Sequence, residues 1–130
     1  MDRIRERLVS SKRALQTLQE LVNLHTVSHV ERDAAIQRFE YTFESIWKTA
    51  QLFLKEIEGL EIGSPKGVIR ASFQTHLLTE DETRLALAMA DDRNLTSHTY
   101  NKGLADKIYK ELGTYADLLE KWLQKIEKNM

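Results

Sequence analysis

Residues 91–101, Asp-Asp-Arg-Asn-Leu-Thr-Ser-His-Thr-Tyr-Asn, carry several side chains that could perform chemistry at close spacing. Arg93 offers a planar guanidinium whose hydrogen-bond donors suit a phosphate group. His98 can carry a proton near neutral pH. The hydroxyl of Tyr100 can donate or accept a hydrogen bond, or be modified. Between Arg93 and His98 only Leu95 is apolar, so this segment is a candidate site for chemistry on a phosphate.

The positions of these residues on a helix do not bring all of them together. At about 100° per residue, Arg93, Ser97 and Tyr100 share one face, whereas His98 lies roughly 140° from Arg93. Arg93 and His98 therefore meet only if the helix loosens here, or across a cleft shared with a second chain. A second interpretation stays open, in which the segment is a frayed helix end and Asn101 caps the next helix. It is open because Asn, Thr and Ser compete with the backbone for hydrogen bonds.

The pattern Arg93-Asn94-x-x-x-His98-x-Tyr100 resembles the Arg-x4-His-x-Tyr motif of the HEPN superfamily (higher eukaryotes and prokaryotes nucleotide-binding). Within it, the chain resembles the branch of nucleotidyltransferase substrate-binding proteins, which includes the HepT-type toxins. The stretch 64–66 (Ser-Pro-Lys) before a short helix is also similar to that branch. The resemblance covers most of the chain and is weakest in the first 25 residues.

The spacing of Arg and His alone is not specific to this superfamily. Arg70 and His76 also satisfy a looser Arg-x(4–6)-His pattern. The asparagine that follows Arg93 and the tyrosine two residues past His98 make the longer motif much more specific.

This resemblance implies a metal-independent endoribonuclease, in which the 2′-hydroxyl of the RNA attacks the adjacent phosphorus. It assigns proton transfer to His98 and charge stabilisation to Arg93, with Asn94 and Tyr100 as supporting residues. One chain has a single motif histidine, so a two-fold homodimer would supply both the base and the acid. We expect no metal and no cofactor.

The same resemblance implies a protein partner. A separately encoded minimal nucleotidyltransferase would act as antitoxin to this toxin and add AMP to Tyr100. An alternative is a non-catalytic subunit that binds substrate or nucleotide for a two-component nucleotidyltransferase. A third interpretation is an interaction protein whose motif is only structural. A nuclease requires His98, a modification acceptor requires Tyr100, and a scaffold requires neither.

Composition predicts one globular cytoplasmic domain over residues 1–130. Apolar residues make up 42% and charged residues 30%, as in folded domains. The absence of cysteine excludes disulfides and thiol catalysis. The start has no apolar signal core, and no stretch approaches the ~20 apolar residues of a membrane span. A formal net charge of −1 argues against a general nucleic-acid binder, so we expect local contacts to RNA and no binding to DNA or membranes.

Apolar residues at helical spacing predict four long helices and one short helix. The first covers about 20 residues, with Ile4, Leu8, Leu15, Leu18 and Val22 on one face. The second follows a capping box at residues 28–31 and has the clearest seam: Ile36, Phe39, Phe43, Ile46, Ala50, Phe53 and Ile57. The expected fold is all-α, an up-and-down antiparallel four-helix bundle with an additional short helix.

The second half of the chain contains the short helix and two further long ones. The short helix begins at Pro65 and directs Val68, Ile69, Phe73 and Leu77 inward. The fourth begins with a capping box at residues 79–82 and directs Leu85, Ala88 and Met89 inward. The last runs from about Lys102, with Gly113 marking a kink or a close approach. His25 and His29 have the spacing of paired metal ligands, but a capping serine between them argues for a loop.

Overall fold

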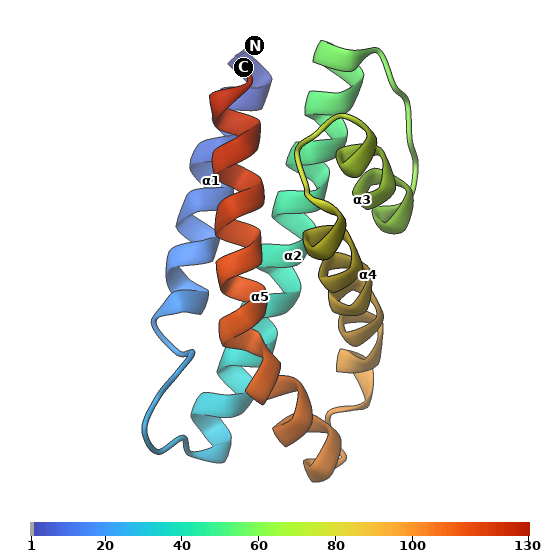
Figure 1. The fold of residues 1–130 in the computed structure, drawn as a ribbon. Helices are drawn as coiled ribbons and strands as arrows, with labels where there is room; N and C mark the ends of the chain where they lie inside the picture. Colours follow the sequence, from blue (N-terminus) through green and yellow to red (C-terminus); the bar gives the residue numbers. More distant parts are fainter. Residues whose placement is uncertain (1) are drawn as a thin grey trace.

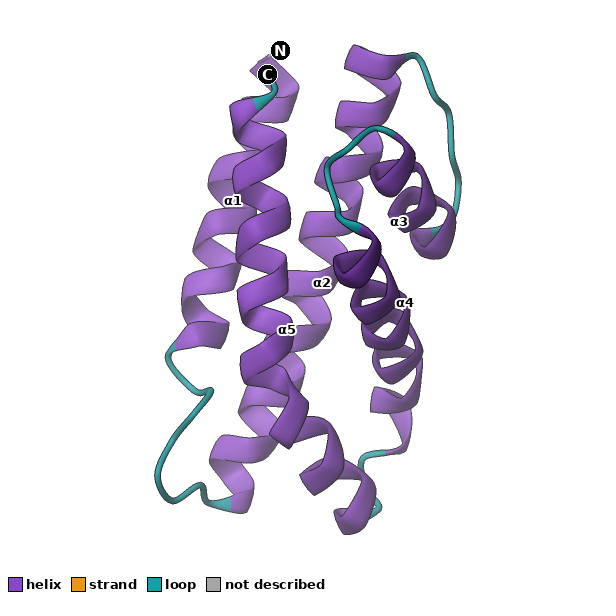
Figure 2. Ribbon diagram, viewed as in Figure 1, coloured by secondary structure: helices purple, strands orange, loops and turns teal. Residues whose placement is uncertain are grey.

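The computed structural model describes residues 2–130, which form five α-helices and one 3₁₀ turn without any β-strand. The elements are α1 (Asp2–Gln19), α2 (His29–Glu58), α3 (Pro65–Gln74), α4 (Glu80–Leu95), η1 (Thr96–His98) and α5 (Lys102–Lys128). The long helices α1, α2 and α5 lie side by side, with α2 and α5 running in one direction and α1 in the opposite direction (Figures 1 and 2). Helix α4, which is antiparallel to α2 and α5, completes the bundle. The short α3 packs beside α2 and α4. The predicted all-α bundle with an additional short helix is confirmed.

The helix starts follow from the capping residues. Ser28 Oγ accepts from the backbone N–H of Glu31 at 3.1 Å, and Glu31 Oε1 accepts from the backbone N–H of Ser28 at 3.0 Å. This exchange satisfies two backbone donors that the first turn leaves unpaired. Thr79 and Glu82 form the same box at α4, and Ser64 caps α3. The predicted caps are confirmed.

The predicted seam of α2 forms the centre of the core, except at its last residue. Ile36, Phe39, Phe43, Ile46, Ala50 and Phe53 are all buried. Ile57 is 41% exposed, so its assignment to the core was wrong. A repeat of 3.5 residues drifts by ~20° per heptad on a straight helix, which rotates Ile57 away from the seam after three heptads. Leu54, eighteen residues after Ile36 and therefore on the same face, is fully buried instead.

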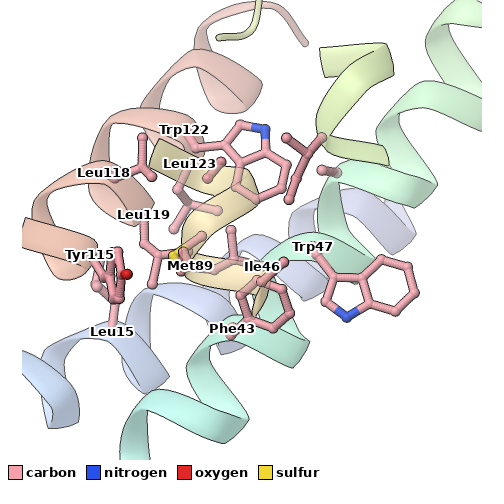
Figure 3. Packing of buried hydrophobic residues seen from close by; sticks show 14 of the residues in the cluster. Leu15, Phe43, Ile46, Trp47, Met89, Tyr115, Leu118, Leu119, Trp122 and Leu123 are labelled. Atoms are coloured by element: carbon pink, nitrogen blue, oxygen red, sulfur yellow. The ribbon is translucent and has the colours of Figure 1, made fainter. Parts of the chain in front are cut away.

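Two inward assignments on α3 and α4 were also wrong. Phe73 is 44% exposed. The buried residues of α3 are Val68, Ile69, Ala71 and Ser72, and Trp122 of α5 donates a hydrogen bond to the Ser72 hydroxyl. Ala88 is exposed, and the buried face of α4 consists of Ala86, Met89 and Ala90. Figure 3 shows Met89 among Phe43 and Ile46 of α2 and Leu119 of α5. This face of α4 therefore points at α2 and α5.

Gly113 marks a close approach of the α1–α2 loop to α5. A Cβ atom at this position would lie 2.5 Å from Asn23 Oδ1, a clash that only a movement of the Asn23 side chain could relieve. Tyr109 donates a hydrogen bond from its hydroxyl to the carbonyl of Leu21 at 2.7 Å. Val22 lies in this loop, beyond the end of α1, and is half-buried. The loop is thus fastened along α5.

Candidate functional site

The motif segment lies where α4 ends and α5 begins, at the lower end of the molecule in Figure 1. Helix α4 stops at Leu95 because side-chain hydroxyls bond to the backbone there. Thr96 Oγ1 lies 2.7 Å from the carbonyl oxygen of Arg93, and Thr99 Oγ1 donates to the carbonyl of Thr96 at 3.0 Å. The angular positions expected for an uninterrupted helix therefore do not apply, and Tyr100 does not share a helix face with Arg93.

The segment between the two helices also contains the cap that the alternative interpretation required. Asn101 Oδ1 accepts from the backbone N–H of Leu104 at 3.1 Å and starts α5. A capping role for Asn101 is compatible with chemistry at Arg93 and His98, because the cap involves neither of those side chains.

Arg93 lies on the buried face of α4 and points at α2. It follows Ala86 by seven residues and Met89 by four, so all three share one helix face. Its side chain is 27% exposed. Arg93 Nη1 lies 3.4 Å from Glu40 Oε2, and Arg93 Nε lies 3.8 Å from Glu44 Oε1. Two carboxylates of α2 thus compensate the guanidinium charge.

Thr96 connects this ion pair to the end of the helix. Arg93 Nη1 donates to Thr96 Oγ1 at 3.0 Å, and the same hydroxyl lies 2.9 Å from Glu40 Oε2. A hydroxyl has one proton, which it can donate either to Glu40 or to the carbonyl of Arg93. The buried Arg93 Nε donates no hydrogen bond within the described chain. The guanidinium is therefore held at Nη1, while its remaining donors are less fully engaged.

His98 and Tyr100 form a second, exposed part of the motif. Their ring centroids are 6.1 Å apart, with an edge-to-face angle of 77°. Tyr100 is 86% exposed, and His98 is exposed as well. Among the hydrogen bonds and ion pairs of residues 2–130, none joins Arg93 to His98. Within one chain, His98 therefore lies beside Tyr100, whereas Arg93 pairs with Glu40 and Glu44.

Arg93 and Asn94 line a groove of about 370 Å³ between α2, the start of α3 and α4. Glu44, Ser64 and Lys66 also line it. The Ser-Pro-Lys stretch is therefore adjacent in space to the Arg-Asn pair, a relation that sequence spacing did not reveal. Lys66 Nζ and Asp91 Oδ1, 2.5 Å apart, link α3 to α4 beside the groove. His98 lies outside this groove.

A hydrogen bond from α5 fixes the residue before Arg93. The hydroxyl of Tyr115 donates to Asp92 Oδ2 at 2.5 Å, and the ring of Tyr115 stacks on Phe39 with centroids 5.7 Å apart. Burial, together with the hydrogen bond and charge of Asp92, raises the pKa of Tyr115. The phenol therefore stays protonated and keeps donating, which anchors the last turn of α4 against α5.

The motif can be recognised in the sequence, but the residues of α2 that pair with Arg93 cannot. Glu40 and Glu44 are separated by one helical turn on α2, as are many surface carboxylates, and nothing in that spacing indicated a cation opposite them. His25 and His29 do not share a helix, since α2 begins at His29. Residues 2–130 contain no group of three or more His, Cys, Asp or Glu that could hold a metal ion. No described helix could span a membrane.

Comparison with known proteins places the chain in a family. Residues 6–128 match the family described as "Nucleotidyltransferase substrate binding protein like". The chain belongs to this family. A crystal structure of a protein from Thermus thermophilus is 56% identical, with a TM-score of 0.88, and the alignment covers 89% of this chain and 98% of that one. No curated protein sequence matches the chain.

More distant structures share the fold of this family member. One is a tri-AMPylated HEPN toxin from Shewanella oneidensis in complex with an MNT antitoxin, 16% identical, with a TM-score of 0.80 and 98% of each chain covered. Another is a toxin–antitoxin complex with AMP-PNP, 16% identical, with a TM-score of 0.79 and coverage of 97% of this chain and 98% of that one. The predicted membership of the nucleotidyltransferase substrate-binding branch is confirmed, and the fold is one that HEPN toxins share.

Proposed function

We propose that this chain is a HEPN-type toxin of the cytoplasm, a metal-independent endoribonuclease neutralised by a separate minimal nucleotidyltransferase that adds AMP to Tyr100. The observation that carries the proposal is the exposed pair of His98 and Tyr100 at the α4–α5 connection, five and seven residues from an arginine that borders a groove. A proton carrier, a phosphate-binding cation and an accessible acceptor hydroxyl thus occupy one short segment. The AMP-modified HEPN toxin of the same fold supports this assignment.

Cleavage of RNA by its own 2′-hydroxyl needs a base, an acid and a cation. The base removes the hydroxyl proton, the new O–P bond forms, and the leaving 5′-oxygen takes a proton from the acid. His98 exchanges these protons, and the guanidinium of Arg93 stabilises the charge on the phosphorane. Glu40 faces Nη1 at 3.4 Å and Glu44 faces Nε at 3.8 Å, which leaves Nη2 to bind a phosphate oxygen. Asn94, on the same groove, orients the phosphate.

The proposal includes a homodimer in which the motifs of two chains face a common cleft. One chain supplies a single motif histidine, and within the described chain no hydrogen bond or ion pair joins that histidine to Arg93. Leu95 exposes apolar surface beside the motif, as a contact with a second copy would require. We expect sedimentation velocity at micromolar concentration to give a dimer. A monomer under these conditions contradicts the expectation, as does a structure with the two motifs on opposite outer surfaces.

The test of the function is RNA cleavage by Arg93→Lys with a chelator present. We expect the wild type to cut RNA at the same rate in EDTA, and Arg93→Lys to lose about 10²–10³-fold in rate, the loss typical for one donor of a charge-stabilising site. An ammonium cannot reproduce the planar contacts of the guanidinium with phosphate and both carboxylates. Arg84→Lys, on an exposed face of α4, is the matched control and should cut normally. Cleavage that requires added Mg²⁺ would contradict the proposed mechanism.

A second candidate is a non-catalytic subunit that binds substrate or nucleotide for a two-component nucleotidyltransferase. The pairing of Arg93 with two carboxylates favours it, since that pairing reduces the net positive charge offered to RNA. Such a subunit would bind its ligand without any dependence on the imidazole of His98. The two candidates therefore differ in what the removal of His98 does to RNA cleavage.

A further inference from the structure

A cavity of about 420 Å³ lies between the first turns of α1, the last turns of α2 and the α2–α3 loop. Four of its nine lining residues are cations and one is an acid. The whole chain has 19 Lys and Arg among 130 residues and a net charge of −1. The four cations are Arg3, Arg7, Lys48 and Lys55. This basic pocket, defined by these four residues, is thus a local excess of positive charge on a nearly neutral protein.

The cations of the basic pocket are weakly engaged within the protein. Lys48 lies 3.8 Å from Glu44, Lys55 lies 3.8 Å from Glu61, and Arg3 lies 3.7 Å from Glu56. All three pairs are solvent-exposed, and exposed ion pairs at such distances contribute little to stability. An incoming anion can therefore compete for these cations.

Arg7 is the least engaged of the four. Its side chain makes no ion pair or hydrogen bond with any other residue in the described part of the chain. The opposite wall is fixed, because Gln51 Nε2 donates to the carbonyl of Ile62 at 2.7 Å and holds the α2–α3 loop along α2. The pocket therefore combines a preformed wall with an available guanidinium.

The basic pocket continues from the groove that contains Arg93. Glu44 lines the groove, and Lys48, one helical turn further along α2, lines the pocket. Gly63 of the loop lines the pocket, and the next residue, Ser64, lines the groove. At 1.5 Å per residue, Gln51 in the pocket lies ~10 Å along α2 from Glu44. A strand with one phosphate at Arg93 could thus extend directly into the pocket.

We propose that the basic pocket binds backbone phosphates of the RNA strand that flank the phosphate held by Arg93. The proposal rests on the proposed function and names a second contact region for the same substrate. No aromatic side chain lines the pocket, so it offers no stacking platform for bases. Its contacts are to phosphate, and they position the strand without selecting a sequence. The pocket also explains how a chain of net charge −1 holds RNA.

The test measures RNA binding in the inactive His98→Ala protein, so that no substrate is cut. The pocket variant adds Arg7→Gln and Lys55→Gln, which remove two cations from the pocket. We expect its affinity for a short fluorescein-labelled single-stranded RNA to fall about tenfold in anisotropy titrations. The slope of log K against log salt should become shallower by about 1.4, since each lost phosphate contact contributes ~0.7 on single strands.

The matched control is Arg13→Gln with Lys125→Gln in the same background. It also removes one arginine and one lysine, and its arginine lies on α1 as Arg7 does. Neither residue lines the basic pocket. We expect the control to bind RNA as the parent does. Equal losses in both variants, or no loss in the pocket variant, would overturn the proposal. A pocket variant that binds RNA normally but no longer binds the partner nucleotidyltransferase would also overturn it and identify a protein-docking surface.

The experiments distinguish an error in the proposed nuclease function from an error in the proposed phosphate binding by the basic pocket. Binding and cleavage are measured separately, so a wild type that does not cut RNA contradicts the function and leaves the binding comparison valid. Conversely, cleavage that depends on His98, together with unchanged RNA binding in the pocket variant, supports the nuclease function and contradicts RNA binding by the basic pocket. Melting curves of all variants should match the parent, because the four substituted side chains are exposed.

Discussion

His98→Ala should lower the rate of RNA cleavage by about 10²–10⁴-fold, the usual contribution of a general acid or base. The side chain is exposed on a turn between two helices, so its removal takes nothing from the core. The variant should therefore melt like the wild type. Single-turnover cleavage of a labelled RNA, with growth inhibition measured in parallel, gives the effect. If the histidines of two subunits act on one phosphate, a dimer mixed from wild-type and variant chains should be impaired as well.

The control for this variant is His25→Ala. His25 is exposed in the α1–α2 loop and belongs to no part of the motif, so its loss should leave cleavage unchanged. A folded His98→Ala protein that cuts RNA as fast as the wild type would contradict the nuclease assignment. In that case the non-catalytic binding subunit becomes the better interpretation, and the exposed His98–Tyr100 pair serves recognition by the partner.

The fold was predictable where periodicity and capping residues agreed. The α2 seam has bulky residues at strict helical spacing, so it defined a buried face without any knowledge of what covers that face. Helix α4 gave no such signal, because residues 85–90 are six consecutive apolar residues and every face of that stretch is apolar. The predicted inward face is therefore displaced by one residue: it includes the exposed Ala88 and omits the buried Ala86 and Ala90.

That one-residue error also concealed the surroundings of Arg93. With Ala86, Met89 and Ala90 buried, Arg93 continues the same face and must point at α2. Its partners there, Glu40 and Glu44, are some fifty residues away in sequence. Periodicity predicts which face of a helix is buried, but not which side chains of another helix stand opposite. The motif could therefore be found from sequence, whereas the carboxylates that hold it required the packing of α4 on α2.

The break after Leu95 has a local cause that the sequence did contain. The segment has Asn, Thr and Ser in close succession, and the hydroxyls of Thr96 and Thr99 bond to the backbone carbonyls of the preceding turn. Such bonds compete with the helix. They turn Tyr100 into solvent and separate the motif into a half-buried arginine and an exposed pair. An exposed hydroxyl is what a modifying enzyme needs in its acceptor.

Co-expression with the cognate nucleotidyltransferase should add AMP to the wild type and not to Tyr100→Phe. In this reaction the phenol oxygen of Tyr100 attacks the α-phosphorus of ATP, the new O–P bond forms, pyrophosphate leaves, and the phenol proton passes to a base. Tyr100 is 86% exposed, and its hydroxyl makes no hydrogen bond within residues 2–130, so no native contact opposes the modification. Intact-protein mass spectrometry measures the adduct.

The adduct should also abolish cleavage, for a physical reason that the geometry provides. The rings of Tyr100 and His98 are 6.1 Å apart, so an attached AMP places a phosphodiester charge beside the proton carrier. That charge repels the substrate phosphate, and the nucleotide occupies the space that RNA needs, by the logic that applies to phosphorylation. Tyr41→Phe is the control, because Tyr41 is exposed but its hydroxyl already bonds to Thr17. AMP adducts that persist in Tyr100→Phe would show that the acceptor is another residue, and the exposed tyrosine would then have no role in neutralisation.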